Sequence, residues 1–199
     1  MSDQGVVSVV LAGVGGQGIL LASEIIAEAA LLSGLEVKTN EVHGMAQRGG
    51  SVVAQIRFGR EVFSPLVREG TAQVLAALEK VEALRYHRYL AADGMAVVST
   101  QEIIPVSVSS GQAVYPGDVD ERLRKLFPRL LPVDALTIAA ELSSPRSTNV
   151  VIVGALSHYL PLDLQDWEGA LRRRIKPGLL EVNRRAFQAG RALAAESGR

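Results

Sequence analysis

Apolar positions along the chain fall into two patterns, short continuous runs and helical spacing. A β-branched run at residues 6–12 predicts a buried strand, and four glycines within residues 13–18 interrupt it. Apolar residues at three- and four-residue spacing then predict a helix over 17–32, which Ser33-Gly34 is suited to end. The chain therefore opens with a strand, a turn and a helix.

The alternation of strands and helices continues, with one departure. Residues 51–58 place apolar side chains at every second position, and Gly59-Arg60 predicts a hairpin turn into a short strand over 61–63. The run 149–160 fits a strand by its β-branched residues and a helix by its length, and we take it as a helix. The other expected strands are 35–39, 71–78, 95–100 behind an Asp93-Gly94 turn, 113–115 and 131–133, and the other expected helices are 79–90, 118–127, 135–142, 163–175 and 179–195.

These elements predict an α/β fold, a Rossmann-like three-layer sandwich whose mostly parallel sheet carries an added antiparallel hairpin. No repeat or long linker divides the 199 residues, so we expect a single domain over residues 1–199. The hydrophobic share of 48% is enough for a sizeable core and leaves apolar surface for a partner. The chain can therefore form an oligomer, and a homodimer is one possibility when the chain is isolated.

Composition excludes several classes of function. Lysine plus arginine equals aspartate plus glutamate at 21 each, so no net field favours nucleic acid or an anionic membrane. The apolar runs are far shorter than the roughly 20 residues that span a bilayer, and no signal peptide is apparent, so we expect a cytoplasmic protein. The chain has no cysteine, which excludes thiolate-held iron–sulfur clusters, and its three histidines are too scattered to predict a metal site.

Residues 13–18 read Gly-Val-Gly-Gly-Gln-Gly, which matches the G-x-G-x-x-G pattern between an expected strand and helix. In that context the first glycine makes a tight turn, the second lets a ligand approach the backbone and the third lets helix and strand pack closely. The free N–H groups of the helix start favour a phosphate or carboxylate. The alternative is that these glycines only permit tight packing. The candidate binding residues of this loop are Gly13, Gly15, Gly16, Gln17 and Gly18.

A second motif, Glu-Val-His-Gly-Met-Ala-Gln-Arg-Gly-Gly-Ser, occupies residues 41–51. The planar guanidinium of Arg48 suits two oxygens of a phosphate or carboxylate, and His43 can donate to the same anion or transfer a proton. These two are the candidate catalytic residues, against the alternatives of an Arg48–Glu41 salt bridge and a solvated or packed His43. The candidate binding residues of this motif are Glu41, Gln47, Arg48, Gly49 and Gly50.

The two motifs together resemble the gamma-type subunit or domain of the 2-oxoacid:ferredoxin oxidoreductases. The Arg-Gly-Gly core is shared widely in that family, whereas His-Gly-Met-Ala-Gln is closest to the small (beta) subunit of indolepyruvate ferredoxin oxidoreductase. Later stretches at 64–66, 79–86, 149–157 and 181–191 match in type, so the resemblance covers nearly the whole chain. By the same resemblance Asn149 is a further residue to watch, although capping its own helix is a sufficient role for it.

The resemblance implies a subunit that is inactive alone and works beside a large subunit. That partner is expected to hold thiamine diphosphate, Mg²⁺ and [4Fe-4S] clusters, and the complex is expected to oxidise a 2-oxoacid to CO₂ and an acyl group on coenzyme A while it reduces ferredoxin. This chain lacks both cysteine and a Gly-Asp-Gly motif for the Mg²⁺ of thiamine diphosphate. It is left to complete the active-site wall and to contact cofactor or coenzyme A phosphates.

Two other functions remain open from the residues. A homo-oligomer that stands alone could use the glycine loop to bind a nucleotide or coenzyme A. An NAD-dependent dehydrogenase would need an acid at the end of the second strand for the ribose, and Glu41 comes slightly late for that position. No hydride-transfer site is evident, which argues against the dehydrogenase.

Overall fold

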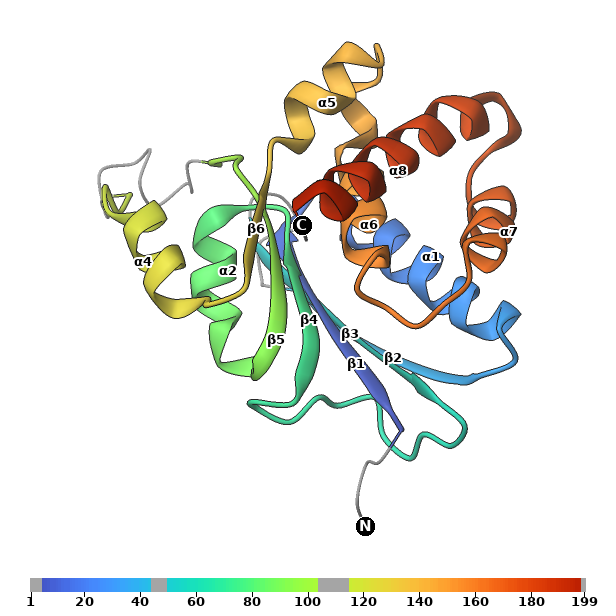
Figure 1. The fold of residues 1–199 in the computed structure, drawn as a ribbon, viewed down its shortest axis with the longest axis horizontal. Helices are drawn as coiled ribbons and strands as arrows, with labels where there is room; N and C mark the ends of the chain where they lie inside the picture. Colours follow the sequence, from blue (N-terminus) through green and yellow to red (C-terminus); the bar gives the residue numbers. More distant parts are fainter. Residues whose placement is uncertain (1–4, 44–49, 104–114, 198–199) are drawn as a thin grey trace.

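The computed structural model describes residues 5–43, 50–103 and 115–197, which form a mixed β-sheet with helices on both faces (Figure 1). The six strands lie in the order β2-β3-β1-β4-β5-β6. The parallel pairs are β1 with β4, β4 with β5 and β5 with β6, whereas β3 is antiparallel to β1 and to β2. The expected sandwich with an antiparallel addition is therefore confirmed. The strands are β1 (Val7–Val14), β2 (Glu36–His43), β3 (Ser51–Gly59), β4 (Ala72–Ala77), β5 (Leu90–Ser99) and β6 (Leu130–Val133).

The helices divide between the two faces and so make three layers (Figure 1). One face carries α1 (Ile19–Leu32), α5 (Ala135–Glu141), α6 (Thr148–Ser157), α7 (Leu164–Arg174) and α8 (Pro177–Ser197). The other carries α2 (Lys80–Tyr86) and α4 (Val119–Leu126). Two 3₁₀ turns, η1 (His87–Tyr89) and η2 (Pro145–Ser147), precede β5 and α6. The sheet thus separates two apolar cores, one on each face.

Strand β3 shows how the alternating pattern works when both faces of a strand are buried. Its even-numbered apolar residues, from Val52 to Phe58, enter the larger core under α1. On the opposite face Gln55 and Arg57 are buried and hold the loop over residues 60–71. Gln55 accepts the N–H of Val67 at 2.7 Å, and the Arg57 guanidinium donates to the carbonyl of Ser64 at 2.9 Å. This loop covers the part of the sheet that α2 and α4 leave open.

The expected hairpin at residues 59–63 is wrong, because residues 60–63 are not in a strand. The antiparallel partners of β3 are instead β1 and β2, and β2 runs on to His43 and pairs with β3 along its whole length. The Asp93-Gly94 turn is also wrong, since both residues lie inside β5. Of the expected strand at 113–115, residues 113–114 lie outside the described residues and Tyr115 is not in a strand.

The ambiguous run at 149–160 is helical as far as Ser157, as we expected, and forms the most buried of the helices in the described ranges. Every residue of α6 from Asn149 to Ser157 is buried. It is enclosed by the sheet, by α1 and by α8. A helix in this position needs apolar residues on all of its sides.

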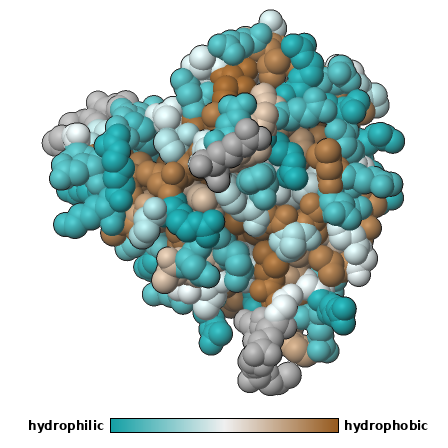
Figure 2. Space-filling view, viewed as in Figure 1, coloured by the Kyte–Doolittle hydropathy of each residue, from teal (hydrophilic) through white to brown (hydrophobic). Residues whose placement is uncertain are grey.

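Large apolar side chains reach the surface from several separate elements. On the face shown in Figure 2, hydrophobic patches are interrupted by hydrophilic side chains. No helix in the described ranges combines the length and the apolar character needed to cross a membrane. The exposed large apolar residues are Leu20, Leu31, Val42, Phe63, Leu66, Leu126, Leu136, Leu164 and Leu179.

Candidate functional site

The candidate site lies at the carboxyl edge of the parallel strands, between β1 and β4. The connection after β1 runs through α1 on one face of the sheet, and the connection after β4 runs through α2 on the other. In open α/β sheets a crevice forms where successive connections leave toward opposite faces, and ligands bind there. The glycine turn after β1 and Leu78 after β4 flank this crevice.

The glycine turn begins later than its sequence pattern predicts. Gly13 lies inside β1, opposite Val52, so the expectation that it makes the tight turn is wrong. Its missing side chain instead leaves room for Gln17 and Ile19, because a Cβ would lie 2.9 Å from atoms of both side chains. The chain reverses at Gly15 and Gly16, and Gly16 has φ of +101°. Gly18, at φ +79°, is the N-cap of α1 and provides no side chain to cap it.

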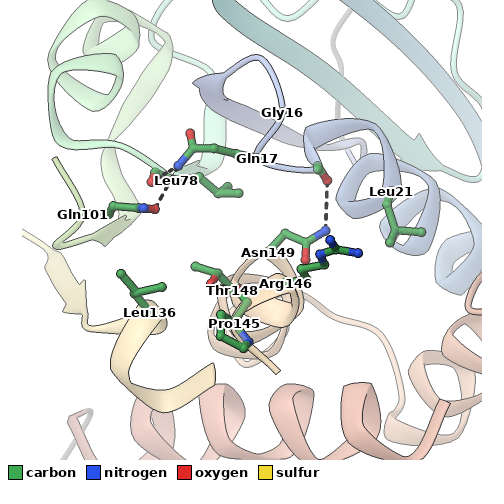
Figure 3. Close-up of a pocket in the computed structure, with 11 residues that line it drawn as sticks. Gly16, Gln17, Leu21, Leu78, Gln101, Leu136, Pro145, Arg146, Thr148 and Asn149 are labelled. Carbon is green, nitrogen blue, oxygen red and sulfur yellow. Dashed lines mark hydrogen bonds between the residues drawn. The ribbon is translucent and has the colours of Figure 1, made fainter. Parts of the chain in front are cut away.

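The side chain of Gln17 points into the protein and joins three segments (Figure 3). Its Oε1 accepts the N–H of Val14 at 2.8 Å, and its Nε2 donates to the carbonyl of Leu78 at 2.8 Å and to Gln101 Oε1 at 3.1 Å. Both amide hydrogens are therefore engaged. Gln17 fixes the turn across the β1–β4 crevice, and this arrangement leaves contact with a ligand to the backbone around it.

The second motif reaches the same edge of the sheet. The backbone of His43 lies opposite Val52 of β3, and Val52 lies opposite Gly13 of β1, so the three strands are level at this point. Gly15 donates its N–H to the carbonyl of Gly50 at 2.8 Å, which ties the glycine turn to the end of the motif. Gln47, Arg48 and Gly49 lie outside the described residues.

Helix α2 holds the last residue of this motif. Ser51 donates its hydroxyl to the buried carboxylate of Glu82 and lies 3.1 Å from the hydroxyl of Tyr86. Glu79, the N-cap of α2, accepts the N–H of Glu82 at 3.0 Å and the hydroxyl of Tyr115 at 2.7 Å. Burial and then the bond to Glu79 raise the pKa of Tyr115 above its ordinary value, so Tyr115 stays a neutral donor. These bonds fix the strand ends beside the turn.

A cavity of about 440 Å³ opens beside the turn (Figure 3). Gly16 and Gly18 at the start of α1 line one wall, and Thr148 and Asn149 at the start of α6 line the other. A helix start leaves its first N–H groups without intrahelical acceptors, and the N-cap residues Gly18 of α1 and Ser147 of α6 make no side-chain capping bond. In the first turn of α6 one of these groups, the N–H of Val150, is bonded to Asn149 Oδ1. Two positive helix ends therefore face one space. The full lining is Gly16, Gln17, Gly18, Leu21, Leu78, Gln101, Leu136, Pro145, Arg146, Thr148 and Asn149.

Arg146 supplies the positive charge of this wall. It is exposed and has no ion-pair partner among the described residues, and the lining contains no carboxylate. A second hollow of about 600 Å³ shares Leu21, Pro145, Arg146 and Asn149 with the first and extends toward Arg174 and Lys176. The cavity is thus suited to a phosphate or carboxylate, which two helix ends and a guanidinium can bind together.

The structure does not bring Glu41 to this cavity. Glu41 is exposed on β2, and β3 separates that strand from β1. In a dinucleotide fold the second strand lies directly beside the first, which is how its acid reaches the ribose. The inserted antiparallel strand removes that relation and with it the geometric basis for a dinucleotide site at this turn.

Several residues of the cavity wall were not identified as candidate binding residues from the sequence, among them Arg146 and Gln101. Gln101 lies in a loop and Arg146 in the short 3₁₀ turn η2, and such residues follow no periodic pattern that predicts their partners. The sequence signal for Arg146 is its position directly before an apolar helix, in Ser-Pro-Arg-Ser-Thr-Asn. Asn149 was noted as a possible cap of its helix. Ser147, not Asn149, is the N-cap of α6, but Asn149 Oδ1 accepts the N–H of Val150 in the first turn at 3.0 Å.

The described residues contain no cluster of three or more histidine, cysteine, aspartate or glutamate side chains arranged to hold a metal ion. With no cysteine anywhere in the chain, the residues present do not fit an iron–sulfur cluster. The chemistry that the site offers is anion binding and positioning.

Comparison with known proteins agrees with the fold and with the resemblance carried by the two motifs. The model of the family "Pyruvate ferredoxin/flavodoxin oxidoreductase" matches residues 8–193. Indolepyruvate oxidoreductase subunit IorB of Archaeoglobus fulgidus is 46% identical over 188 residues, which make up 92% of this chain and 92% of that protein.

Two solved structures share the fold. One is the gamma subunit of a keto/oxoacid ferredoxin oxidoreductase from Geobacter sulfurreducens, with a TM-score of 0.71 at 22% identity, covering 96% of this chain and 99% of that one. The other is a 2-oxoglutarate:ferredoxin oxidoreductase from Magnetococcus marinus, with a TM-score of 0.72 at 23% identity, where the match covers 96% of this chain and 31% of that chain. The resemblance drawn from the motifs is confirmed, and the chain belongs to the pyruvate ferredoxin/flavodoxin oxidoreductase family.

Proposed function

We propose that this chain is the small subunit of a cytoplasmic, indolepyruvate-type 2-oxoacid:ferredoxin oxidoreductase. A larger partner subunit holds the thiamine diphosphate, the Mg²⁺ and the iron–sulfur clusters. The complex oxidises an aryl 2-oxoacid to CO₂ and an acyl group on coenzyme A and passes the electrons to ferredoxin. The relatives that are named indolepyruvate oxidoreductase subunits, among them the 46% identical protein of Archaeoglobus fulgidus, support this assignment.

One structural observation carries the role of this chain within the complex. Two helix starts whose N-cap residues make no side-chain capping bond line the same cavity of about 440 Å³ as Arg146, and none of the described lining residues carries a carboxylate. Such a wall attracts a phosphate group of coenzyme A or of the partner's cofactor. The Arg48 motif reaches this edge of the sheet through Gly50, whose carbonyl is bonded to the turn.

The residues of the cavity wall bind and orient the anion. Thiamine diphosphate, when bound to the partner, supplies the decarboxylation chemistry. On this chain the N–H groups around Gly16 and Gly18 hold the anion, Arg146 neutralises its charge, and Leu21 and Leu136 provide an apolar wall that excludes water. His43 and Arg48 stay the candidate catalytic residues, which would act on the substrate from the neighbouring motif.

Reconstitution tests the assignment to the complex. The large subunit that copurifies with this chain from its source cells is assayed for ferredoxin reduction with indolepyruvate and coenzyme A. We expect turnover only when both chains are present, because this chain has no cysteine to carry electrons and the partner alone lacks the cavity wall. Equal turnover of the large subunit alone removes the proposed role and leaves the function of a separate binding module.

Arg146 gives a direct test of the cavity. Arg146→Ala should weaken the binding of coenzyme A and of pyrophosphate to the isolated chain by roughly tenfold, the loss expected for one charged hydrogen bond. Arg60→Ala is the matched control, because Arg60 is also exposed and follows β3 at the opposite end of the sheet. Titration calorimetry measures both. Equal affinities of the two variants would assign the anion to another part of the surface.

A further inference from the structure

The amide of Asn149 connects the start of α6 to the glycine turn (Figure 3). Asn149 is 4% exposed, and its Nδ2 donates to the carbonyl of Gly18 at 3.1 Å. Its Oδ1 accepts the N–H of Val150 at 3.0 Å. One side chain thus joins two helix starts that are 131 residues apart in the chain.

Gly18 is shaped to receive this amide. A Cβ on Gly18 would lie 2.5 Å from Asn149 Nδ2, so the amide packs directly against the glycine backbone. The carbonyl of Gly18 also accepts the N–H of Ala22 at 3.1 Å, which is the first helical bond of α1. Removing the amide therefore leaves helix α1 its own hydrogen bonds but deletes the connection to α6.

Capping does not explain the bond to Gly18. The N-cap of α6 is Ser147, Thr148 bonds back to the carbonyl of Pro145 at 2.8 Å, and only the Oδ1 of Asn149 takes part in the helix start, so its Nδ2 is not used for capping. Asn183 is the contrasting case, since its buried amide donates within its own helix to Leu179 at 2.8 Å. The Asn149 donor goes instead to another element, on the wall of the cavity.

We propose that Asn149 is a positioning residue, which fixes the glycine turn against α6 so that both helix starts and Arg146 act on one anion. This inference rests on the proposed anion-binding role of the cavity. The bonds from Asn149 Nδ2 and from the N–H of Ala22 occupy the carbonyl oxygen of Gly18, so its partial negative charge is engaged by donors beside the site proposed for an anion. Its contribution is to the geometry of the turn, and the N–H groups and Arg146 make the contacts.

The experiment uses pyrophosphate as the probe and the full chain as the protein. We expect Asn149→Ala to bind pyrophosphate three- to tenfold more weakly, which corresponds to the loss of one neutral hydrogen bond. Hydrogen exchange of the amides over residues 15–19 should become faster in the same variant, because the turn is no longer tied down. Ser157→Ala is the control: Ser157 is equally buried at the other end of α6, where it donates to Gly154 at 2.7 Å.

If Asn149→Ala does not fold, Asn149→Asp replaces it, since the carboxylate still accepts from Val150 but cannot donate to Gly18. Thr148→Asp then controls for the added charge in the cavity, and only the Asn149 variant should speed exchange in the turn. Wild-type affinity and exchange in the Asn149 variant would overturn the positioning role and leave the proposed function intact. A wild-type chain that does not bind pyrophosphate would remove the anion site, and the role of Asn149 with it.

Discussion

Gly16 and Gly18 have left-handed backbone angles in different surroundings. A Cβ on Gly16 meets nothing within 4 Å, whereas a Cβ on Gly18 meets the Asn149 amide at 2.5 Å. Gly16→Ala should therefore cost only backbone strain, about 1–2 kcal/mol of unfolding free energy. Gly18→Ala should cost about 1–3 kcal/mol more, because it adds a steric clash. Urea denaturation measures both, and equal losses would mean that Asn149 moves aside freely.

The buried carboxylate of Glu28 gives a pH-dependent contribution to stability. Arg173 donates to it at 2.8 Å, as does the Nε of Arg174. The bond from Arg173 and the charge of both arginines lower the pKa of Glu28 from its ordinary 4.5, against the opposing effect of burial. A lowered pKa contributes stability that is present above the ordinary value and is lost as the pH falls through the folded-state pKa.

Glu28→Gln should thus be less stable than the wild type at pH 7 by about 1–2 kcal/mol, a range that is discounted because both arginines are partly exposed. The difference should stay constant above about pH 5 and shrink below 4.5. Chemical denaturation across pH 3–7 measures it. Glu181→Gln is the control, because that side chain is 78% exposed and its contact with Arg184 is 3.5 Å long. A difference that grows at low pH would contradict the ion-pair explanation.

At the scale of elements, α6 and α8 cross at two glycines that allow their backbones to touch. A Cβ on Gly154 would lie 2.0 Å from the carbonyl oxygen of Phe187, and one on Gly190 would lie 2.0 Å from that of Val151. Each alanine substitution should force the two helices apart. The free energy of unfolding should fall by about 3 kcal/mol, at the upper end of overpacking effects. Gly178→Ala, on α8 with open space around it, should cost nothing or stabilise slightly. Thermal unfolding of the three variants checks the contrast.

Strand extents were predictable only where strands are buried. The runs that became β1 and β4 are apolar because these inner strands have helices on both faces, and the short edge strand β6 is apolar at its buried residues Leu131 and Val133. Strand β2 is at the edge of the sheet and exposed, so the polar residues Glu41 and His43 looked like loop. Asp93 and Gly94 looked like a turn but lie in the first half of β5, where Asp93 is exposed and Gly94 is buried, and a Cβ on Gly94 would meet the carbonyl of Ala72 at 2.9 Å. That glycine serves close backbone approach at a strand irregularity.

The site was predictable where its geometry is local. A strand, a glycine run and a helix in sequence predicted the turn and the open helix start, because these depend on residues within one short segment. The opposite wall depends on contacts across more than 100 residues, such as the bond from Asn149 to Gly18. Periodicity carries no information about which loop packs against which helix start. Arg146 therefore needed the fold before its place on the cavity wall could be seen.

At the scale of the whole molecule, one sheet joins two separate cores. The larger core contains Trp167 and Phe187 under α7 and α8, and the smaller contains Leu123 and Phe127 at and just beyond α4. Figure 1 places α4 and α7 on opposite sides of the sheet. Strands β1 and β3 supply side chains to both cores. If one core unfolds, the strands that the other core packs on are disrupted as well. We therefore expect the whole chain to unfold as one cooperative unit.

The single tryptophan makes this expectation measurable. Leu123→Ala removes a side chain that is 4% exposed in the smaller core and should cost about 2–4 kcal/mol. If the chain is one domain, the urea midpoint of Trp167 fluorescence in the larger core should shift as far as the midpoint of far-UV circular dichroism. Leu126→Ala, on the same helix but 43% exposed, should shift neither by much. In one cooperative unit the shared sheet transmits the loss of stability from α4 to α7. An unchanged Trp167 midpoint in Leu123→Ala would therefore show that the two cores unfold separately.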